Sequence, residues 1–154
     1  MQAFQDIFSQ HISSEEKILL AISGWVDSMV MLDVVEKLHP KKNIIIAHFD
    51  HSLRWAESEG DRDMVIAVAQ KNNISCEVKS VHVSLLADEE KMSIEAVARK
   101  YRYEFLFQIA QQYSAKYILT AHHLDDRIET MMFNLIRWSK LWGIHALSRM
   151  QNHE

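Results

Sequence analysis

The sequence predicts an α/β fold in which helices flank a parallel, twisted sheet. Short apolar runs of strand length alternate along the chain with segments whose apolar residues recur at helical spacing. This alternation is typical of right-handed βαβ units, which place helices on both faces of the sheet. Ligands of such sheets bind beyond the carboxyl ends of the strands. Functional residues are therefore expected where the predicted strands end.

The predicted elements follow one another without a linker or an internal repeat. The expected strands are 17–23, 43–49, 74–81 and 117–122, and the expected helices are 26–38, 56–72, 93–113 and 125–136. Three consecutive isoleucines favour the second strand, because β-branched side chains fit a pleated sheet. Pro40 ends the first helix, and Ser93 is the expected N-cap of the third.

The composition is that of a single globular domain. The chain has 154 residues, 48% of them hydrophobic, and no apolar run reaches the roughly 18–20 residues that span a bilayer. The N-terminus lacks the pattern of a signal peptide, and a single cysteine, Cys76, excludes an internal disulfide. We therefore expect a cytoplasmic protein with no membrane partner. The net charge of −4 gives no sign of nucleic acid binding, and the basic residues at 99–102 fit a solvated helix face.

The first polar stretch is "SGWVDS" (23–28), which follows the first predicted strand and opens the first helix. Backbone N–H groups at a helix N-terminus bind phosphate where small residues allow close approach, and Ser23 and Ser28 add hydroxyl donors. Asp27 would repel phosphate unless it holds a metal ion or orients the loop. An ordinary turn capped by Ser23 or Asp27 is the alternative. Trp25 is unexpected, because so bulky a side chain in a phosphate loop would crowd the bound phosphate.

The second stretch is "AHFDHSLR" (47–54), at the end of the second predicted strand. Its polar residues, His48, Asp50, His51 and Arg54, could contact a nucleotide or ligate a metal ion. They could equally be polar loop residues without a function.

The third stretch is "TAHHLDDRIET" (120–130). Asp126 and Glu129 would share one helix face, where they could bind Mg²⁺ beside phosphates or hold an ammonium group. The alternative is that the two carboxylates lie in the first turn of a helix only because they interact favourably with its dipole. His122 and His123 could ligate a metal, but adjacent residues of an extended chain point in opposite directions.

Together the three stretches resemble the PP-loop ATP pyrophosphatases and, within them, the tRNA(Ile)-lysidine synthase family. "IEAVARKYRY" (94–103) and "NLIRWSKLWGI" (134–144) resemble further segments of that family, and the similarity covers about residues 17–147. The resemblance implies an adenine nucleotide alpha hydrolase-like, Rossmann-type fold. It also implies that residues 1–154 form one catalytic domain, without the C-terminal domains usual in the family.

Three of the four tryptophans stand where the family pattern has glycine. The family's loop reads Ser-Gly-Gly-x-Asp-Ser, so Trp25 replaces its second glycine, and Trp55 and Trp138 replace glycines after the other two stretches. We predict that the source organism reads UGA as glycine and that the chain was translated with a code that reads it as tryptophan. An indole at position 25 is expected to resist the dihedral angles of glycine and to crowd bound phosphates.

The resemblance implies a carbon–nitrogen ligase that uses ATP and Mg²⁺. The wobble cytidine of an isoleucine tRNA with a CAU anticodon would attack the α-phosphate, pyrophosphate would leave, and the amine of L-lysine would displace AMP to form lysidine. The implied ATP-binding residues are Ser23, Gly24, Trp25, Val26, Asp27, Ser28, Ala47 and His48. The implied catalytic residues are Asp27, Asp126 and Glu129, of which Asp126 and Glu129 would hold Mg²⁺ or the lysine ammonium. Arg54 and Arg137 would contact phosphates or tRNA.

Three alternatives stay open at this point. One is another PP-loop tRNA-modifying or amidating enzyme, although the single Cys76 disfavours thiolation, which typically needs paired cysteines. The second is a non-catalytic nucleotide- or tRNA-binding fragment, which a genuine Trp25 would favour. The third is a metal-dependent hydrolase that uses the histidine and aspartate clusters. The sequence leaves the oligomeric state open and is compatible with a homodimer.

Overall fold

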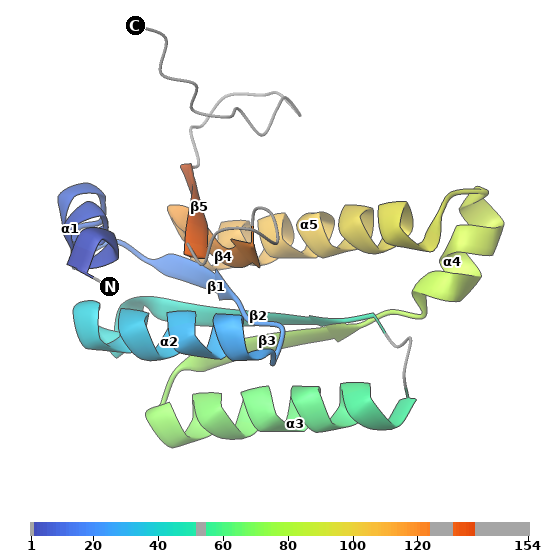
Figure 1. The fold of residues 1–154 in the computed structure, drawn as a ribbon, viewed down its shortest axis with the longest axis horizontal. Coiled ribbons are helices and arrows are strands. Elements are labelled where there is room, and N and C mark those ends of the chain that lie inside the picture. The colour runs from blue at the N-terminus through green and yellow to red at the C-terminus, as the bar shows by residue number, and fades with distance from the viewer. Residues whose placement is uncertain (1, 52–54, 124–130, 138–154) are drawn as a thin grey trace, which may run out of the picture.

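The fold is a five-stranded sheet of order β3-β2-β1-β4-β5, covered by helices on both faces (Figure 1). The computed structural model describes residues 2–51, 55–123 and 131–137, and the side chains of residues 5–51 and 60–121. The strands are β1 (Ile18–Ala21), β2 (Ile44–Asp50), β3 (Ser75–Ser80), β4 (Tyr117–His123) and β5 (Met131–Arg137). The first four are parallel, which confirms the predicted fold class.

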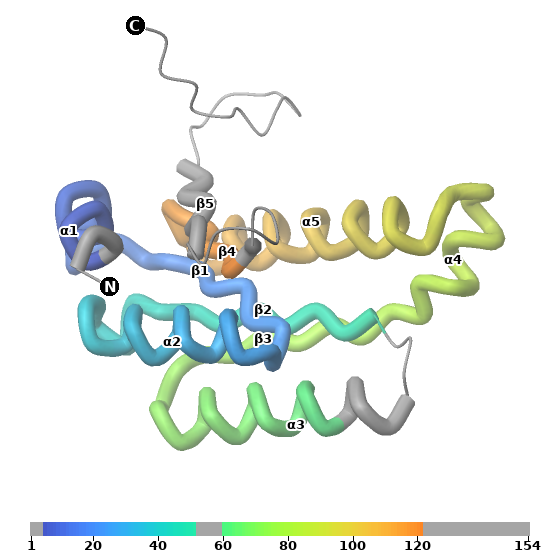
Figure 2. Tube along the Cα trace, in the orientation of Figure 1, coloured from blue at the N-terminus to red at the C-terminus, as the bar shows by residue number. Residues whose placement is uncertain are grey.

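The helices enclose the sheet from two sides. They are α1 (Gln2–His11), α2 (Val26–Leu38), α3 (Trp55–Asn72), α4 (Val83–Glu90) and α5 (Ile94–Tyr113), with a 3₁₀ turn over Lys41–Asn43. Figure 2 shows α2 and α3 along one side of the sheet and α5 along the other. No helix among the described residues is long and apolar enough to cross a membrane.

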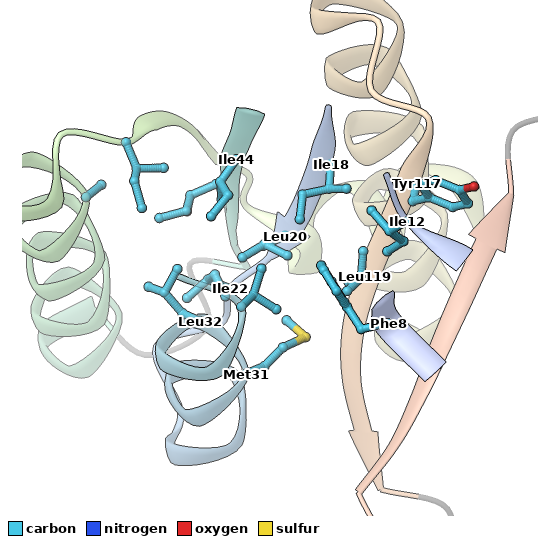
Figure 3. Packing of buried hydrophobic residues seen from close by; sticks show 14 of the residues in the cluster. Phe8, Ile12, Ile18, Leu20, Ile22, Met31, Leu32, Ile44, Tyr117 and Leu119 are labelled. Carbon is cyan, nitrogen blue, oxygen red and sulfur yellow. The ribbon is translucent and has the colours of Figure 1, made fainter. Parts of the chain in front are cut away.

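Alternate residues of each central strand enter two separate cores. Ile18 and Leu20 of β1 face the core under α1, α2 and α3, while Leu19 between them faces the core under α4 and α5. Figure 3 shows the first core, where Met31 and Leu32 of α2 pack near Leu20. Burial on both faces explains why the central strands are continuous apolar runs.

The helix predicted over 125–136 is wrong for its second half, because Met131–Arg137 forms β5. This strand is antiparallel to β4, with His123 opposite Met131 and Tyr117 opposite Arg137. The segment "MMFNLIR" is a short apolar run, which periodicity alone cannot assign to helix or strand. Without β5, strand β4 would be an edge strand with unpaired backbone N–H and C=O groups. Because the segment pairs with these groups, it forms a strand and not a helix.

The strand order creates a switch point between β1 and β4. The chain leaves β1 towards β2 on one side, while β4 pairs with β1 on the other side. Segments that leave two such strands diverge, and ligands bind in the crevice that opens between them. The loop after β1, at residues 22–25, lies at this point of the sheet.

Candidate functional site

The loop between β1 and α2 turns sharply at Gly24. Gly24 has φ of +92°, a region that L side chains rarely adopt, whereas Trp25 has φ of −76° and ψ of 156°. The helix begins at Val26, so the loop delivers the chain directly into the first turn of α2. The strand–loop–helix arrangement predicted for residues 23–28 is therefore confirmed.

Two serines close this loop on itself. Ser28 is buried, donates its hydroxyl proton to the Trp25 carbonyl oxygen at 2.8 Å, and accepts the backbone N–H of Ser23 at 3.2 Å. The two hydroxyl oxygens of Ser23 and Ser28 lie 3.1 Å apart. Since a serine has one hydroxyl proton and Ser28 gives its own to Trp25, Ser23 is the donor of that pair. Ser28 thus braces the loop, and Ser23, which is exposed, is the serine that a ligand can reach.

The first turn of α2 lacks a side-chain cap. Trp25 occupies the N-cap position and makes no capping hydrogen bond, since an indole offers no acceptor oxygen. The expected alternative, a turn whose N-cap is Ser23 or Asp27, is therefore wrong. The first N–H groups of a helix have no partner within it, so α2 presents its N-terminal amides and its positive dipole end at the switch point.

Trp25 fits the loop without backbone strain. Its dihedral angles are ordinary extended ones, so the expectation that a side chain at 25 resists the backbone conformation is wrong. The positive φ belongs to Gly24, which the chain retains. The indole is 69% exposed and Val26 beside it is 76% exposed. Any conflict at position 25 must therefore come from a ligand that approaches the amides of α2.

Strand β2 anchors the start of the loop. The backbone N–H of Ile22 donates to the carbonyl of Ala47, and Nδ1 of His48 bonds the carbonyl of Ile22 at 2.8 Å. Nδ1 therefore carries the ring proton, which leaves Nε2 as an acceptor. This atom is buried and has no hydrogen-bond partner among the described residues. Ala47 is buried in the core under α5, so its side chain faces away from α2.

Asp61 of α3 is a neighbour of the loop that no sequence pattern indicated. A Cβ placed on Gly24 would lie 2.9 Å from Cβ of Asp61 and 3.2 Å from its carboxyl carbon. The side chain of Asp61 therefore occupies the space that a residue larger than glycine would need. The two positions are far apart in sequence, and no spacing rule connects them.

Asp50 is the last residue of β2, and His51 follows it. Asp50 is buried and accepts a hydrogen bond from the hydroxyl of Ser80 on β3 at 3.2 Å. His51 packs edge-on against Phe49, with ring centroids 5.0 Å apart. Burial, and secondarily the positive charge of Arg102, hold the pKa of His51 below its usual value. His51 is consequently neutral near pH 7.

Several predicted residues lie outside the described part of the chain. Arg54, Asp126 and Glu129 are outside it altogether, as is the side chain of Arg137, whose backbone belongs to β5. Asp27 lies in the first turn of α2. Within the described side chains, no three histidine, cysteine or carboxylate groups converge as a metal site would require.

The PP-loop domain family matches residues 1–154, the whole of the chain. The chain belongs to the PP-loop domain family. This membership confirms the resemblance inferred from the three polar stretches and the ATP-binding class that the resemblance implies.

PP-loop relatives share sequence with nearly the whole chain. The chain is 40% identical over 138 residues to a tRNA(Ile)-lysidine synthase of Thermosipho africanus. The matched residues make up 88% of the chain and 32% of that relative. It is 34% identical over 150 residues to a tRNA(Ile)-lysidine synthase of Bacillus subtilis, covering 96% of the chain and 32% of the relative. The chain thus spans about a third of the length of these two proteins.

A solved structure shows the same fold. The NH3-dependent NAD synthetase from Campylobacter jejuni superposes with a TM-score of 0.55 at 12% sequence identity, over 77% of this chain and 51% of that one. This likeness supports the architecture alone, because the identity is too low to carry a function.

Proposed function

We propose that this chain supplies the ATP-dependent chemistry of lysidine formation on the wobble cytidine of isoleucine tRNA with a CAU anticodon. The observation that carries the proposal is the uncapped N-terminus of α2, which follows the positive-φ turn at Gly24 at the switch point of a PP-loop sheet. Relatives named for this activity, 40% and 34% identical, support the choice of substrate. The place of such a reaction is the cytoplasm, where tRNA is found.

The chain's own residues would act mainly by binding and orientation. Backbone N–H groups of residues 26–28 hold the pyrophosphate part of ATP, and the hydroxyl of Ser23 turns from Ser28 to a phosphate oxygen. Donors aimed at this group stabilise the negative charge that grows on it as the bond to the α-phosphate breaks. Ser28 keeps the loop in shape through its bonds to Ser23 and Trp25. Ala47 and His48 lie beside the adenosine half.

Two carboxylates near the loop would supply part of the ligand set of a divalent cation that arrives with ATP. Asp27, in the first turn of α2, and Asp61, packed against Gly24, offer the oxygen ligands that Mg²⁺ prefers. Mg²⁺, when bound, neutralises part of the phosphate charge and keeps these carboxylates from repelling ATP. Asp126 and Glu129 complete the proposed catalytic set, where they hold Mg²⁺ or the lysine ammonium, while Arg54 and Arg137 contact phosphates or tRNA.

The experiment compares the chain as written with its Trp25→Gly variant. Each is mixed with ATP, Mg²⁺, radiolabelled lysine and an isoleucine tRNA transcript with a CAU anticodon, and lysine on the tRNA is counted. We expect Trp25→Gly to incorporate more lysine and to bind ATP more tightly in calorimetry, because an indole at the first turn of α2 crowds the phosphates.

Leu85→Ala is the control, since Leu85 is an exposed apolar side chain of α4, outside the candidate functional site. It should leave ATP affinity close to that of the chain as written. Equal ATP affinity for the chain and its Trp25→Gly variant would refute the crowding. Lysine incorporation by neither form would contradict the proposed function for this chain.

A further inference from the structure

Helix α5 carries an array of cations and aromatic rings at the margin of the core under α4 and α5, against which the half-buried Tyr103 packs. The guanidinium carbons of Arg99 and Arg102 lie 5.3 Å and 5.5 Å from the ring centroid of Tyr103. The ring of Phe107 lies 6.3 Å further along, centroid to centroid, at a tilt of 31°. Arg99, Tyr103 and Phe107 are spaced four residues apart, so they follow one line along the helix. We call these four residues the arginine–tyrosine face.

The two arginines differ in their ion pairs from the lysine that stands between them. Neither forms an ion pair with a carboxylate of the described residues, whereas Lys100 between them binds Glu90 at 2.8 Å. Lys79 adds a further positive charge, 5.9 Å from the ring centroid of Phe105. In a chain whose net charge is −4, this is a local concentration of positive charge.

The face is continuous with the candidate functional site. Arg102 lies close enough to His51, at the end of β2, for its charge to act on that imidazole. Phe105, on the same helix, packs against Phe49 at 6.0 Å between ring centroids. In Figure 2 the first turns of α5 lie towards the side on which β2 ends. A ligand on the face would therefore extend towards the residues that follow β2.

We propose that the arginine–tyrosine face binds the single-stranded loop of the RNA substrate, with a base stacked at Tyr103 and phosphates bound by Arg99 and Arg102. Flat rings bounded by unpaired guanidinium groups recognise unstacked bases and backbone phosphates, which a paired helix does not offer together. The inference rests on the proposed function for its choice of RNA as partner. Beyond that function, it identifies the surface that binds the RNA and the side chains that contact it.

The test measures binding of a fluorescein-labelled anticodon stem-loop with the sequence CAU by fluorescence anisotropy. We expect Tyr103→Ala to weaken binding on the order of tenfold, since stacking on an aromatic side chain contributes at about that level. Tyr103→Phe keeps the ring and should bind as the unaltered chain does. The double variant Arg99→Ala with Arg102→Ala should also make binding less dependent on salt. The slope of the logarithm of the binding constant against the logarithm of the salt concentration should become less steep by about 0.7 for each phosphate that the protein no longer neutralises.

Lys100→Ala is the matched control, because Lys100 lies on the same helix but is already paired with Glu90. The surface is contradicted if this variant weakens binding as much as Arg102→Ala, if Tyr103→Ala binds normally, or if the unaltered chain does not bind the stem-loop. Equal affinity for a fully paired RNA of the same length would contradict loop recognition. ATP affinity is measured on every variant and should not change, so failure of the ATP site is seen separately from failure of this surface.

Discussion

The hydroxyl of Ser28 shows how one small side chain gives the loop after β1 its shape. It joins the backbone N–H of Ser23, which precedes the helix, to the carbonyl of Trp25, which also accepts the helical N–H of Met29. Because Ser28 is buried, removal of its hydroxyl would leave the N–H of Ser23 without this partner at a cost of about 1–3 kcal/mol, while the Trp25 carbonyl would keep its bond from the N–H of Met29. Its contribution is therefore to conformation, while Ser23 remains for the ligand.

Substitution of two glycines should have opposite effects on stability. We expect Gly24→Ala to lower the free energy of unfolding by roughly 1–3 kcal/mol, because φ of +92° disfavours a side chain and the new Cβ meets Asp61 at 2.9 Å. Gly60→Ala should raise it by about 0.5–1 kcal/mol, since Gly60 lies within α3 with open space around it. Urea unfolding measures both values, and a loss for Gly60→Ala equal to that for Gly24→Ala would contradict the explanation.

The order of residues in the chain was enough to locate the loop but not to assign its internal contacts. Serine, glycine and aspartate after an apolar run indicate a phosphate-type turn, and the turn is where the pattern placed it. Ser28 holds the loop and Ser23 is open to a ligand because the hydroxyl of Ser28, and not that of Ser23, is buried. The contact between Gly24 and Asp61 depends on how α3 packs. Neither property is encoded in local spacing.

At the scale of elements, apolar periodicity predicted the long helices and the parallel strands well. Helix α2 covers the predicted residues, and Ser93 caps α5 by accepting the N–H of Ala96 at 3.2 Å. Helix α1 and the eight-residue helix α4 were not predicted. Their packing against the rest of the molecule, through Val83 of α4 and Phe8 of α1, decides their structure more than their own pattern does.

Strand β3 gives a prediction about the single thiol. Burial, with a smaller contribution from the neighbouring Glu77, raises the pKa of Cys76 from 9.0 to about 11. The thiolate is the reactive form, so the reaction with a disulfide reagent at pH 8 should be on the order of a hundred times slower than for an unburied thiol. Unfolding in urea should abolish the difference, and raising the pH towards 11 should accelerate the reaction of the folded protein. A folded-state rate equal to the unfolded one would contradict this.

The stability of the whole molecule should fall in mild acid. Burial lowers the pKa of His39, whose Nε2 lies 2.8 Å from the carbonyl oxygen of Glu16. As the pH falls through the ordinary pKa of 6.5, the imidazole in the unfolded chain binds its proton before the imidazole in the folded chain does. The free energy of unfolding therefore decreases as the pH drops through this value, and the lowered pKa of His51 acts in the same direction.

Urea midpoints at pH 7.5 and 5.5 measure this effect. We expect His39→Gln to reduce the difference between the two midpoints, because glutamine can still donate to Glu16 but does not titrate. The exposed His82 offers a matched control, and His82→Gln should leave more of the difference in place. An unchanged difference in the His39 variant would show that the acid sensitivity has another origin.

The glycine content of the chain leads to a prediction about its gene. Three glycines in 154 residues are few, since average usage of about 7% gives roughly eleven. We expect the codons for Trp25, Trp55 and Trp138 to be UGA, and a UGG codon at any of them would refute recoding at that position. In the structure Trp25 is exposed and unstrained, so the fold itself tolerates either residue.

The anchoring of Ile22 to β2 and the Ser23–Ser28 pair have a consequence for the entropy of ligand binding. Ordering one residue of a flexible backbone costs about 1–2 kcal/mol at 25 °C, and a mobile loop would incur this for each residue when a ligand arrives. Here the residues that lead into α2 are already held by hydrogen bonds to Ala47, His48 and Ser28. That ordering takes place when the protein folds, so most of the interaction energy with a ligand remains available as affinity.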